Sequence, residues 1–386
     1  MDQGIIPMLF ALLRCAICGE KIPDEMSAQY SEEQLPGLIK EARNQDLLHL
    51  LAFGLKRSQL LPNGDAELEK QIFKAAYQCE RLDYECTQIW ATLEAAEIPF
   101  VPLKGAVLRQ YYPETWMRTS CDIDVLVRPE DLERAISCLV QSLGYVEKER
   151  GTHDVLLFSP RGDHIELHFD LVEEGRAKGA IGTLSAVWAN VIVHENSRYW
   201  YEMTDEFFYF YHIAHMAKHL EDGGCGIRPF IDIWILEHIA GADQGKREQL
   251  LEKSGLRSFA QVAQKLSRVW MNGEDADEVS LKLQGYILWG SVYGSADRRV
   301  ALQQKNKGGR IGYLFSRIFI PYAKLKRYYP VLEKHRWLVP AMQIRRWAML
   351  LRPDIARMAR RELEANKRVD PAKAEEMNAF LKSVGL

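Results

Sequence analysis

The sequence of 386 residues has few cysteines, no long apolar run and no excess of one charge. Its seven cysteines are an odd number in a long chain, which does not indicate a disulfide framework. The apolar stretch at residues 5–13 lacks a basic leader and is too short to span a bilayer, and no other stretch approaches about 18 uncharged apolar residues. We therefore expect a cytoplasmic protein without a transmembrane segment.

The formal net charge of −3 excludes a chain that binds polyanions through its overall composition. The charge is nevertheless unevenly distributed along the sequence. Residues 301–386 hold 19 Lys and Arg against 7 Asp and Glu, whereas residues 1–300 hold 31 against 46. The basic C-terminal region can face nucleic acid, a phosphosugar or a membrane surface, and a solvated helical surface is the alternative interpretation.

The length and pattern of the chain indicate an α+β protein of two or three domains. Apolar residues make up 47% and charged residues 27%, as in an ordered globular protein. Residues 1–95 and 204–386 carry apolar residues at helical spacing, and the second of these regions is basic after about residue 305. Residues 96–203 alternate short apolar runs with helical segments, which predicts a small mixed-sheet core flanked by helical regions.

The core region predicts the series strand, helix, strand, helix, strand, strand. Its expected elements are strand 100–103, helix 105–112, strand 121–127, helix 129–143 and strands 155–158 and 165–171. The clearest helices expected outside the core are 68–95, 206–220 and 227–239. A Pro-Asn-Gly turn at residues 62–64 and a looser glycine-rich stretch at residues 305–310 precede further helices.

The expected strand 121–127 carries two carboxylates at alternate positions. Alternate side chains of a strand share a face, so Asp122 and Asp124 point the same way, while the isoleucine and valines between and after them point into the core. Two neighbouring carboxylates on an apolar strand repel each other and are costly to desolvate. A divalent cation removes that repulsion, and hard oxygen ligands suit Mg²⁺.

The later strand 165–171 repeats this pattern, with Glu166, His168 and Asp170 on one face. If the two strands pair, Glu166 completes a three-carboxylate cluster that can hold two metal ions for phosphoryl transfer. His168 can orient phosphate or shuttle a proton, or it can be a partly buried structural histidine. The alternative for the whole cluster is a pair of half-exposed strands with acidic outer faces.

Several segments of the chain together form a recognisable pattern. They are VPLKGAVLRQYYPETWMRTSCDIDVLV at residues 101–127, Glu-Leu-His at 166–168, HIAHMAKHL followed by GIRPFIDIWIL within 212–236, and YYPVLEKHRWLVPAMQIRRW at 328–347. This pattern resembles the uncharacterised nucleotidyltransferase family of bacteria, a branch of the DNA polymerase β-like superfamily. The resemblance spans roughly residues 70–350.

The resemblance implies a role for each carboxylate. Asp122 and Asp124 would bind two Mg²⁺ ions, with Mn²⁺ as an alternative metal. Glu166 would be the third metal ligand and a base for the incoming hydroxyl. Glu in place of the Asp common at this position lengthens the reach by one methylene group.

The resemblance also implies nucleotide contacts around the Lys-Gly turn. Gly105 and Ala106 would let the backbone approach the triphosphate. Superfamily members usually have Gly-Ser or Gly-Gly in this turn, so one hydroxyl contact with phosphate is missing here. Lys104 and Arg118 would neutralise phosphate charge, with a surface position as the alternative for each.

A later helix carries His215, Lys218 and His219 on one face, at spacings of three and four residues. We expect this helix to line the cleft opposite the carboxylates, with Lys218 near phosphate. Zinc binding by the two histidines is the alternative, although no Glu follows His215 as in a metalloprotease. Asp232 is expected either to pair with Arg228 as scaffolding or to contribute to the site.

These features predict a metal-dependent nucleotidyltransferase that moves a nucleoside monophosphate from an NTP to a hydroxyl-bearing acceptor and releases pyrophosphate. The candidate acceptors are a small molecule, a protein side chain and an RNA end. A catalytically degenerate nucleotide- or partner-binding module is the alternative, which the retained carboxylates oppose. A third hypothesis is a membrane-surface protein, because residues 311–322 are apolar around Arg317 and many basic residues follow.

Overall fold

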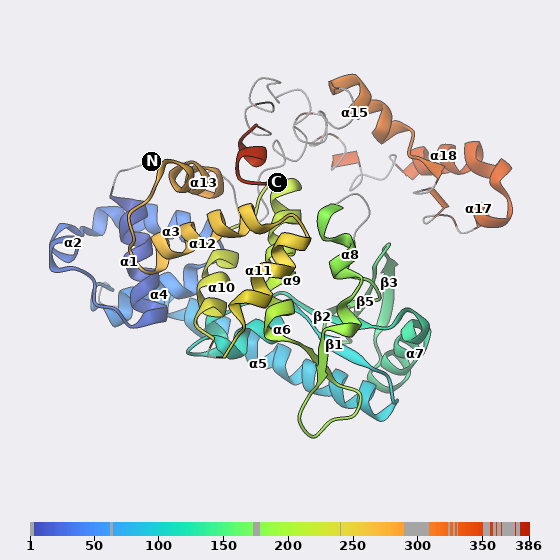
Figure 1. Cartoon of the computed structure of the whole chain (residues 1–386), viewed down its shortest axis with the longest axis horizontal. Coiled ribbons are helices and arrows are strands. Elements are labelled where there is room, and N and C mark those ends of the chain that lie inside the picture. Colours follow the sequence, from blue (N-terminus) through green and yellow to red (C-terminus); the bar gives the residue numbers. More distant parts are fainter. Residues whose placement is uncertain are drawn as a thin grey trace.

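The structure of the chain is a computed structural model, shown whole in Figure 1. It describes residues 4–61, 65–172, 178–239, 241–288, 309–322 and 331–349, with residues 325–326, 329, 356–357, 360, 364, 375 and 379–386. The turn expected at residues 62–64 and the part of the glycine-rich stretch at 305–308 lie outside these residues.

A mixed sheet of five strands forms the core, in the order β1-β2-β5-β4-β3. The strands are β1 (Phe100–Pro102), β2 (Asp122–Val127), β3 (Val146–Arg150), β4 (Asp154–Phe158) and β5 (His164–His168). β2 pairs in parallel with β5, and the other neighbours are antiparallel. The expected α+β class is therefore confirmed. β3 was not predicted, because this exposed edge strand reads Val-Glu-Lys-Glu-Arg and has no apolar alternation.

Both faces of β2 are covered by other parts of the chain. On one face, Ile123, Val125 and Val127 pack in a core with α5 (Ala66–Ala95) and α7 (Leu132–Leu143). On the other face, Leu126 belongs to a second core that includes α9 (Asp205–Glu221). A polar side chain on this second face is consequently buried between the sheet and the helical region, and this is the position of Asp124.

The helices before and after the sheet share that second core. The helices before α5 are α1 (Ile5–Cys18), α2 (Asp24–Gln29), α3 (Leu35–Asn44) and α4 (Leu48–Arg57). Those after the sheet are α8 (Ile181–Leu184), α9, α10 (Arg228–Glu237), α11 (Gln244–Lys253), α12 (Arg257–Met271) and α13 (Glu278–Leu288). Phe10 of α1 stacks on Trp270 of α12 with ring centroids 4.6 Å apart, so chain segments far apart in sequence meet here.

The expected elements differ from the observed ones mainly at their ends. The helix expected at 105–112 is α6 (Lys104–Leu108) followed by a 3₁₀ turn. The strand expected to reach residue 171 ends at His168, because the N–H groups of Phe169 and Asp170 both donate to the carbonyl of His153. Asp170 is therefore exposed after the strand instead of extending the face of Glu166. A short hairpin of β6 (Val191–Val193) and β7 (Tyr201–Met203) was also not predicted.

The described C-terminal residues include α15 (Gly309–Ile318), α17 (Val331–Lys334) and α18 (Val339–Ala348). Figure 1 shows these three helices gathered at one end of the molecule, away from α1 to α4. Among the described residues, no helix has the length and apolarity needed to cross a bilayer.

Candidate functional site

The parallel pairing of β2 with β5 brings the predicted carboxylates together. Asp124 lies opposite Glu166 in the register, and Asp122 lies opposite His164. Since paired residues of adjacent strands share a face, these four side chains form one surface at the centre of the sheet. His164 was missed by sequence reasoning, although its position two residues before Glu166 already placed it on that face.

The potential ligand atoms on this surface form two overlapping groups. One group contains Asp122, His164 and Glu166, and the other contains Asp124, Glu166 and His168. Within each group the ligand atoms all lie within 4.8 Å of one another. Glu166 belongs to both groups, so a single carboxylate could bridge two neighbouring cations.

The electrostatics of the two aspartates differ because their neighbours differ. Burial and the adjacent charge of Asp124 raise the pKa of Asp122 to about 6. Burial alone would also raise the pKa of Asp124, but the Lys104 ammonium and the His168 hydrogen bond outweigh it and lower that pKa. The surface thus holds more negative charge than its own cationic side chains neutralise, and Asp122 carries the excess.

Lys104 lies against these carboxylates. Its Nζ is 2.6 Å from Oδ1 of Asp124 and 3.8 Å from Oε2 of Glu166. The backbone of Lys104 has φ of 45°, a left-handed conformation that is costly for a side-chain-bearing residue and that occurs preferentially at functional sites. The residue predicted to contact phosphate is therefore held beside the proposed metal ligands, through a strained turn between β1 and α6.

The contact with Ser120 requires a glycine at position 105 of the turn. The predicted approach of the Gly105 backbone to the triphosphate stays a prediction. A Cβ atom added at Gly105 would lie 2.9 Å from the Cβ of Ser120, so no larger residue fits without displacement. Arg109 fixes this contact, because its Nε donates to the Gly105 carbonyl and its Nη2 donates to Oγ of Ser120. Ala106 is half-buried against the core that the sheet forms with α5 and α7. Sequence reasoning missed Arg109, which is buried and pairs with Asp83 at 2.6 Å.

Arg118 points away from solvent into an ion pair with Asp232 of α10. Its Nε and Nη2 donate to the two carboxylate oxygens of Asp232 at 2.8 and 2.9 Å. The hydroxyl of Tyr112 donates to the same carboxylate at 2.7 Å. The expected pairing of Asp232 with Arg228 is wrong, because Arg228 instead bonds to Asp46 and to the carbonyl of Thr119.

His168 connects the carboxylates to a pocket. Its Nε2 hydrogen bonds to Oδ1 of Asp124 at 2.9 Å. Burial alone would lower the pKa of His168, but hydrogen bonds to Asp124 and Glu166 outweigh it and raise the pKa. The potential ligand atoms of His168, of His153 before β4 and of Asp154 on β4 also lie within 4.8 Å of one another.

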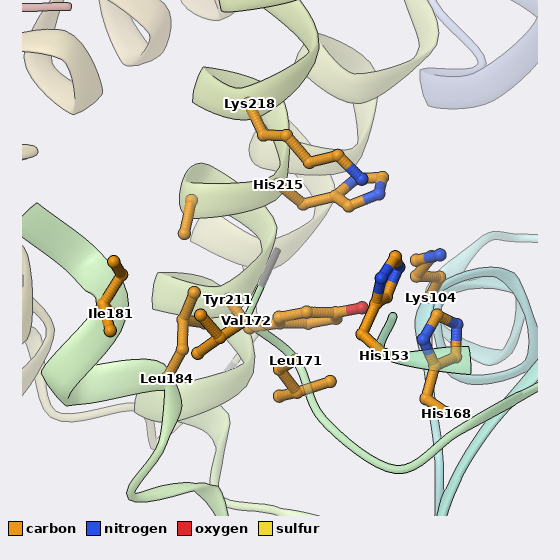
Figure 2. A pocket seen from close by; sticks show the side chains of 11 residues that line it. Lys104, His153, His168, Leu171, Val172, Ile181, Leu184, Tyr211, His215 and Lys218 are labelled. Atoms are coloured by element: carbon orange, nitrogen blue, oxygen red, sulfur yellow. The ribbon is translucent and has the colours of Figure 1, made fainter. Parts of the chain in front are cut away.

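The adjacent pocket is lined by Lys104 and His168 on the sheet side and by α8 and α9 on the other (Figure 2). Tyr211, His215 and Lys218 reach it from α9, whereas His219, expected on the same helix face, is not among the lining residues. Apolar side chains complete the wall, namely Leu171, Val172, Ile181, Leu184 and Ala214. The pocket therefore combines an apolar wall with the cationic side chains of Lys104 and Lys218.

His215 and His219 contact each other through Nε2 atoms 3.2 Å apart. Burial, followed by the nearby charge of Lys104, lowers the pKa of His215 well below its ordinary value, so its imidazole is neutral. The candidate metal groups among the described residues include neither of these two histidines. His215 belongs to the wall of the pocket. Within the described part of the chain, the two histidines have no third ligand with which to bind zinc.

Comparisons with known proteins found one family and one solved structure to report. The family described as uncharacterised nucleotidyltransferase matches residues 31–272, which is more than half of the chain. Among solved structures, the antibiotic-resistance factor ANT(2'')-Ia is similar over 54% of this chain and 98% of that chain, at 10% sequence identity and a TM-score of 0.27. No curated protein matches the chain.

Proposed function

The chain belongs to the uncharacterised nucleotidyltransferase family, and from this premise we propose that it transfers a nucleoside monophosphate from an NTP to a hydroxyl-bearing acceptor. The observation that carries the proposal is the meeting of Asp122, Asp124 and Glu166 on adjacent parallel strands. The pocket beside them supplies two lysines for phosphate and an apolar wall for a ring-bearing group of either substrate.

The donor set fits divalent cations. Three carboxylates with excess negative charge are the ligands that Mg²⁺ and Mn²⁺ prefer, and the two neighbouring imidazoles suit Mn²⁺ better than Mg²⁺. We propose that Asp122, Asp124 and Glu166 hold the ions, with His164 and His168 at their sides. When bound, the ions would neutralise charge on the phosphates and on the attacking oxygen.

The reaction is a single in-line displacement. The acceptor oxygen forms a bond to the α-phosphorus while the bond from that phosphorus to the pyrophosphate oxygen breaks. The proton of the acceptor hydroxyl passes to a carboxylate oxygen of Glu166, whose side chain is 31% exposed and can reach a substrate. Lys104 and Lys218 stabilise the charge that develops on the departing pyrophosphate.

Lys104 has a second part in this proposal. In the present arrangement its ammonium supplies positive charge to Asp124 and Glu166. Cations held by these carboxylates would neutralise them, which would leave the flexible lysine side chain available to the triphosphate. The strained backbone of the Lys-Gly turn keeps the ammonium within reach of both positions.

Arg118 serves the site as a positioning residue in this proposal. Its bidentate bond to Asp232 ties the segment before β2 to α10, and so joins the proposed core region 96–203 to the proposed helical region 204–386. Gly105 and Ala106 shape the turn before the nucleotide, through the close approach of Gly105 to Ser120. Their contact with phosphate is through backbone N–H groups at the start of α6.

The test is a calorimetric titration with Mg²⁺ and each NTP, followed by mass analysis for pyrophosphate with small-molecule, protein and RNA acceptors. NTP binding that requires the metal, with pyrophosphate release, supports transfer. Metal-dependent binding without turnover on any acceptor class would favour the degenerate binding module. Glu149→Gln on the edge strand β3 is the matched control, because Glu149 is an exposed carboxylate on the same sheet.

A further inference from the structure

α15 presents an apolar face to solvent, while Tyr313 on its other side is buried. Tyr313 is 2% exposed, whereas Ile311, Phe315, Ile318 and Phe319 are between 46% and 71% exposed. Ile311, Phe315 and Ile318 follow the spacing of one helical face, and Phe319 continues that face just beyond the helix. The helix is therefore packed, and it is packed with its larger apolar face outward.

α18 holds α15 in this orientation through polar bonds. The carbonyl of Ile318 accepts from Nε1 of Trp347 at 2.8 Å and from Nη1 of Arg346 at 3.0 Å. The carbonyl of Ile320 accepts from Gln343 at 2.8 Å. Carbonyls at a helix end need such partners, so these bonds fix the end of α15. Trp347 also contacts the ring of Phe319, with ring centroids 5.4 Å apart, and Phe319 remains 52% exposed.

The same unit exposes further large apolar side chains. Trp337 is 76% exposed and Ile344 is 61% exposed. Of the 17 large apolar side chains that are exposed among the described residues, 8 lie within residues 309–349. Such a concentration on one short segment marks an interaction surface, since scattered exposed apolar residues are the usual case.

The sequence of this region carries charge of almost one sign. Residues 301–350 contain 11 Lys and Arg and a single acidic residue, Glu333. Lys334, Arg336 and Arg345 are exposed on the segments that carry Trp337 and Ile344. A unit that exposes both apolar and basic side chains is complementary to a surface of anionic headgroups over hydrocarbon.

We propose that the exposed side chains of Ile311, Phe315, Ile318 and Phe319, together with those of Trp337 and Ile344 in the same unit, dock on an anionic lipid surface. The helices lie in the plane of the interface, with these side chains at the boundary of headgroups and acyl chains and the basic side chains among the headgroups. Aliphatic and phenyl side chains on a helical face fit hydrocarbon better than they fit nucleobases, which stack on flat aromatic platforms in a basic groove. This proposal is independent of the transfer reaction.

The experiment is co-sedimentation of the full chain with vesicles of phosphatidylcholine alone and of phosphatidylcholine with phosphatidylserine, at low and high salt. We expect at least about tenfold stronger binding to the anionic vesicles at low salt, because anionic headgroups attract basic residues near the surface and salt screens that attraction. Phe315→Asp with Phe319→Asp should reduce this binding at least about tenfold. Lys334→Glu with Arg336→Glu should remove the preference for anionic vesicles.

Phe73→Asp with Tyr77→Asp on α5 is the matched control, because these aromatic residues are 75% and 71% exposed but lie outside the basic region. This control should bind vesicles like the unmodified chain, and thermal unfolding checks that every variant is folded.

If Phe315→Asp with Phe319→Asp does not fold, Trp337→Phe replaces it. The proposal then expects Trp337→Phe to reduce the blue shift of tryptophan emission on anionic vesicles, and an unchanged shift would contradict it. Equal binding to both vesicle types, no binding to either, or stronger binding of a single-stranded RNA oligomer through the same residues would each overturn the proposal.

Discussion

On β2, the charged side chain of Asp124 is 2% exposed, whereas on α15 the apolar side chain of Phe315 is 59% exposed. Both residues depart from the usual distribution, in which charges face water and large apolar groups are buried. The protein satisfies the first departure internally, through Lys104 and His168. The second departure has no such cover among the described residues, and the lipid surface that we propose would supply one.

This comparison teaches which departures call for a ligand. A buried charge that is fully paired, as Asp232 is by Arg118 and Tyr112, serves the fold. A half-buried carboxylate whose pKa is raised by desolvation and by a neighbouring carboxylate, as at Asp122, is a place where a cation would lower the electrostatic cost. An exposed apolar face indicates missing contact area. The following predictions separate these three cases, beginning with the largest effect.

Asp124→Asn should abolish nucleotidyl transfer, with a loss of at least about 1,000-fold in kcat, because one ligand of the proposed cations is lost. The variant should remain folded, although Lys104 loses its nearest carboxylate. Pyrophosphate release measures the effect, and Asp122→Asn should behave similarly. If Asp124→Asn retains more than a tenth of the activity while Glu149→Gln is unaffected, the carboxylates are not the metal ligands.

Arg118→Ala should lower the free energy of unfolding by about 3–5 kcal/mol, because it leaves the fully buried Asp232 without its cationic partner. Urea unfolding at neutral pH measures this change. Arg150→Ala is the control, since Arg150 pairs with Glu133 and Glu147 on the exposed edge of the sheet and should contribute less than about 1 kcal/mol. Similar losses in the two variants would show that burial does not distinguish these ion pairs.

His49 should make the fold sensitive to acid. Burial lowers the pKa of His49 to about 4, and its Nε2 bonds to the carbonyl of Met117 at 3.0 Å. Between about pH 6.5 and pH 4 the unfolded chain binds a proton at His49 that the folded chain does not, so stability falls as pH falls through this window.

The expected slope from His49 is about 1.4 kcal/mol per pH unit, which reaches roughly 3 kcal/mol at pH 4. His49→Gln should flatten the acid side of the stability curve by this amount, as measured by urea unfolding at pH 7 and pH 4.5. Parallel curves for the variant and the unmodified chain would show that His49 titrates normally in the folded state.

Gly105→Ala should lower the free energy of unfolding by about 1–3 kcal/mol, because the new methyl group meets Ser120. Combining Gly105→Ala with Ser120→Gly should recover part of this loss, since the Cβ that blocks the methyl group is removed. Thermal unfolding of the two single variants and of the double variant gives the coupling. Strict additivity would contradict the close contact that the structure shows between these residues.

Much of the fold could be predicted from local pattern. The strand at β2, the helix at α7 with Gly144 beyond its end, and the long helix α5 all follow from apolar spacing and end signals. β3 could not be predicted, because its side chains are exposed and mostly charged and only its pairing with β4 makes it a strand. The early end of β5 likewise depends on a carbonyl of His153, which is distant in the sequence pattern but adjacent in space.

The sequence by itself determined that Asp122, Asp124 and Glu166 lie on strand faces, since the alternation of a strand is a property of neighbouring residues. Only the tertiary structure decided that β2 and β5 are parallel neighbours in the register that joins these carboxylates with His164. It also assigned Arg118 to Asp232, more than 100 residues away, and turned the apolar face of α15 outward. Such outcomes depend on which segments meet in space, and no local pattern of residues encodes that.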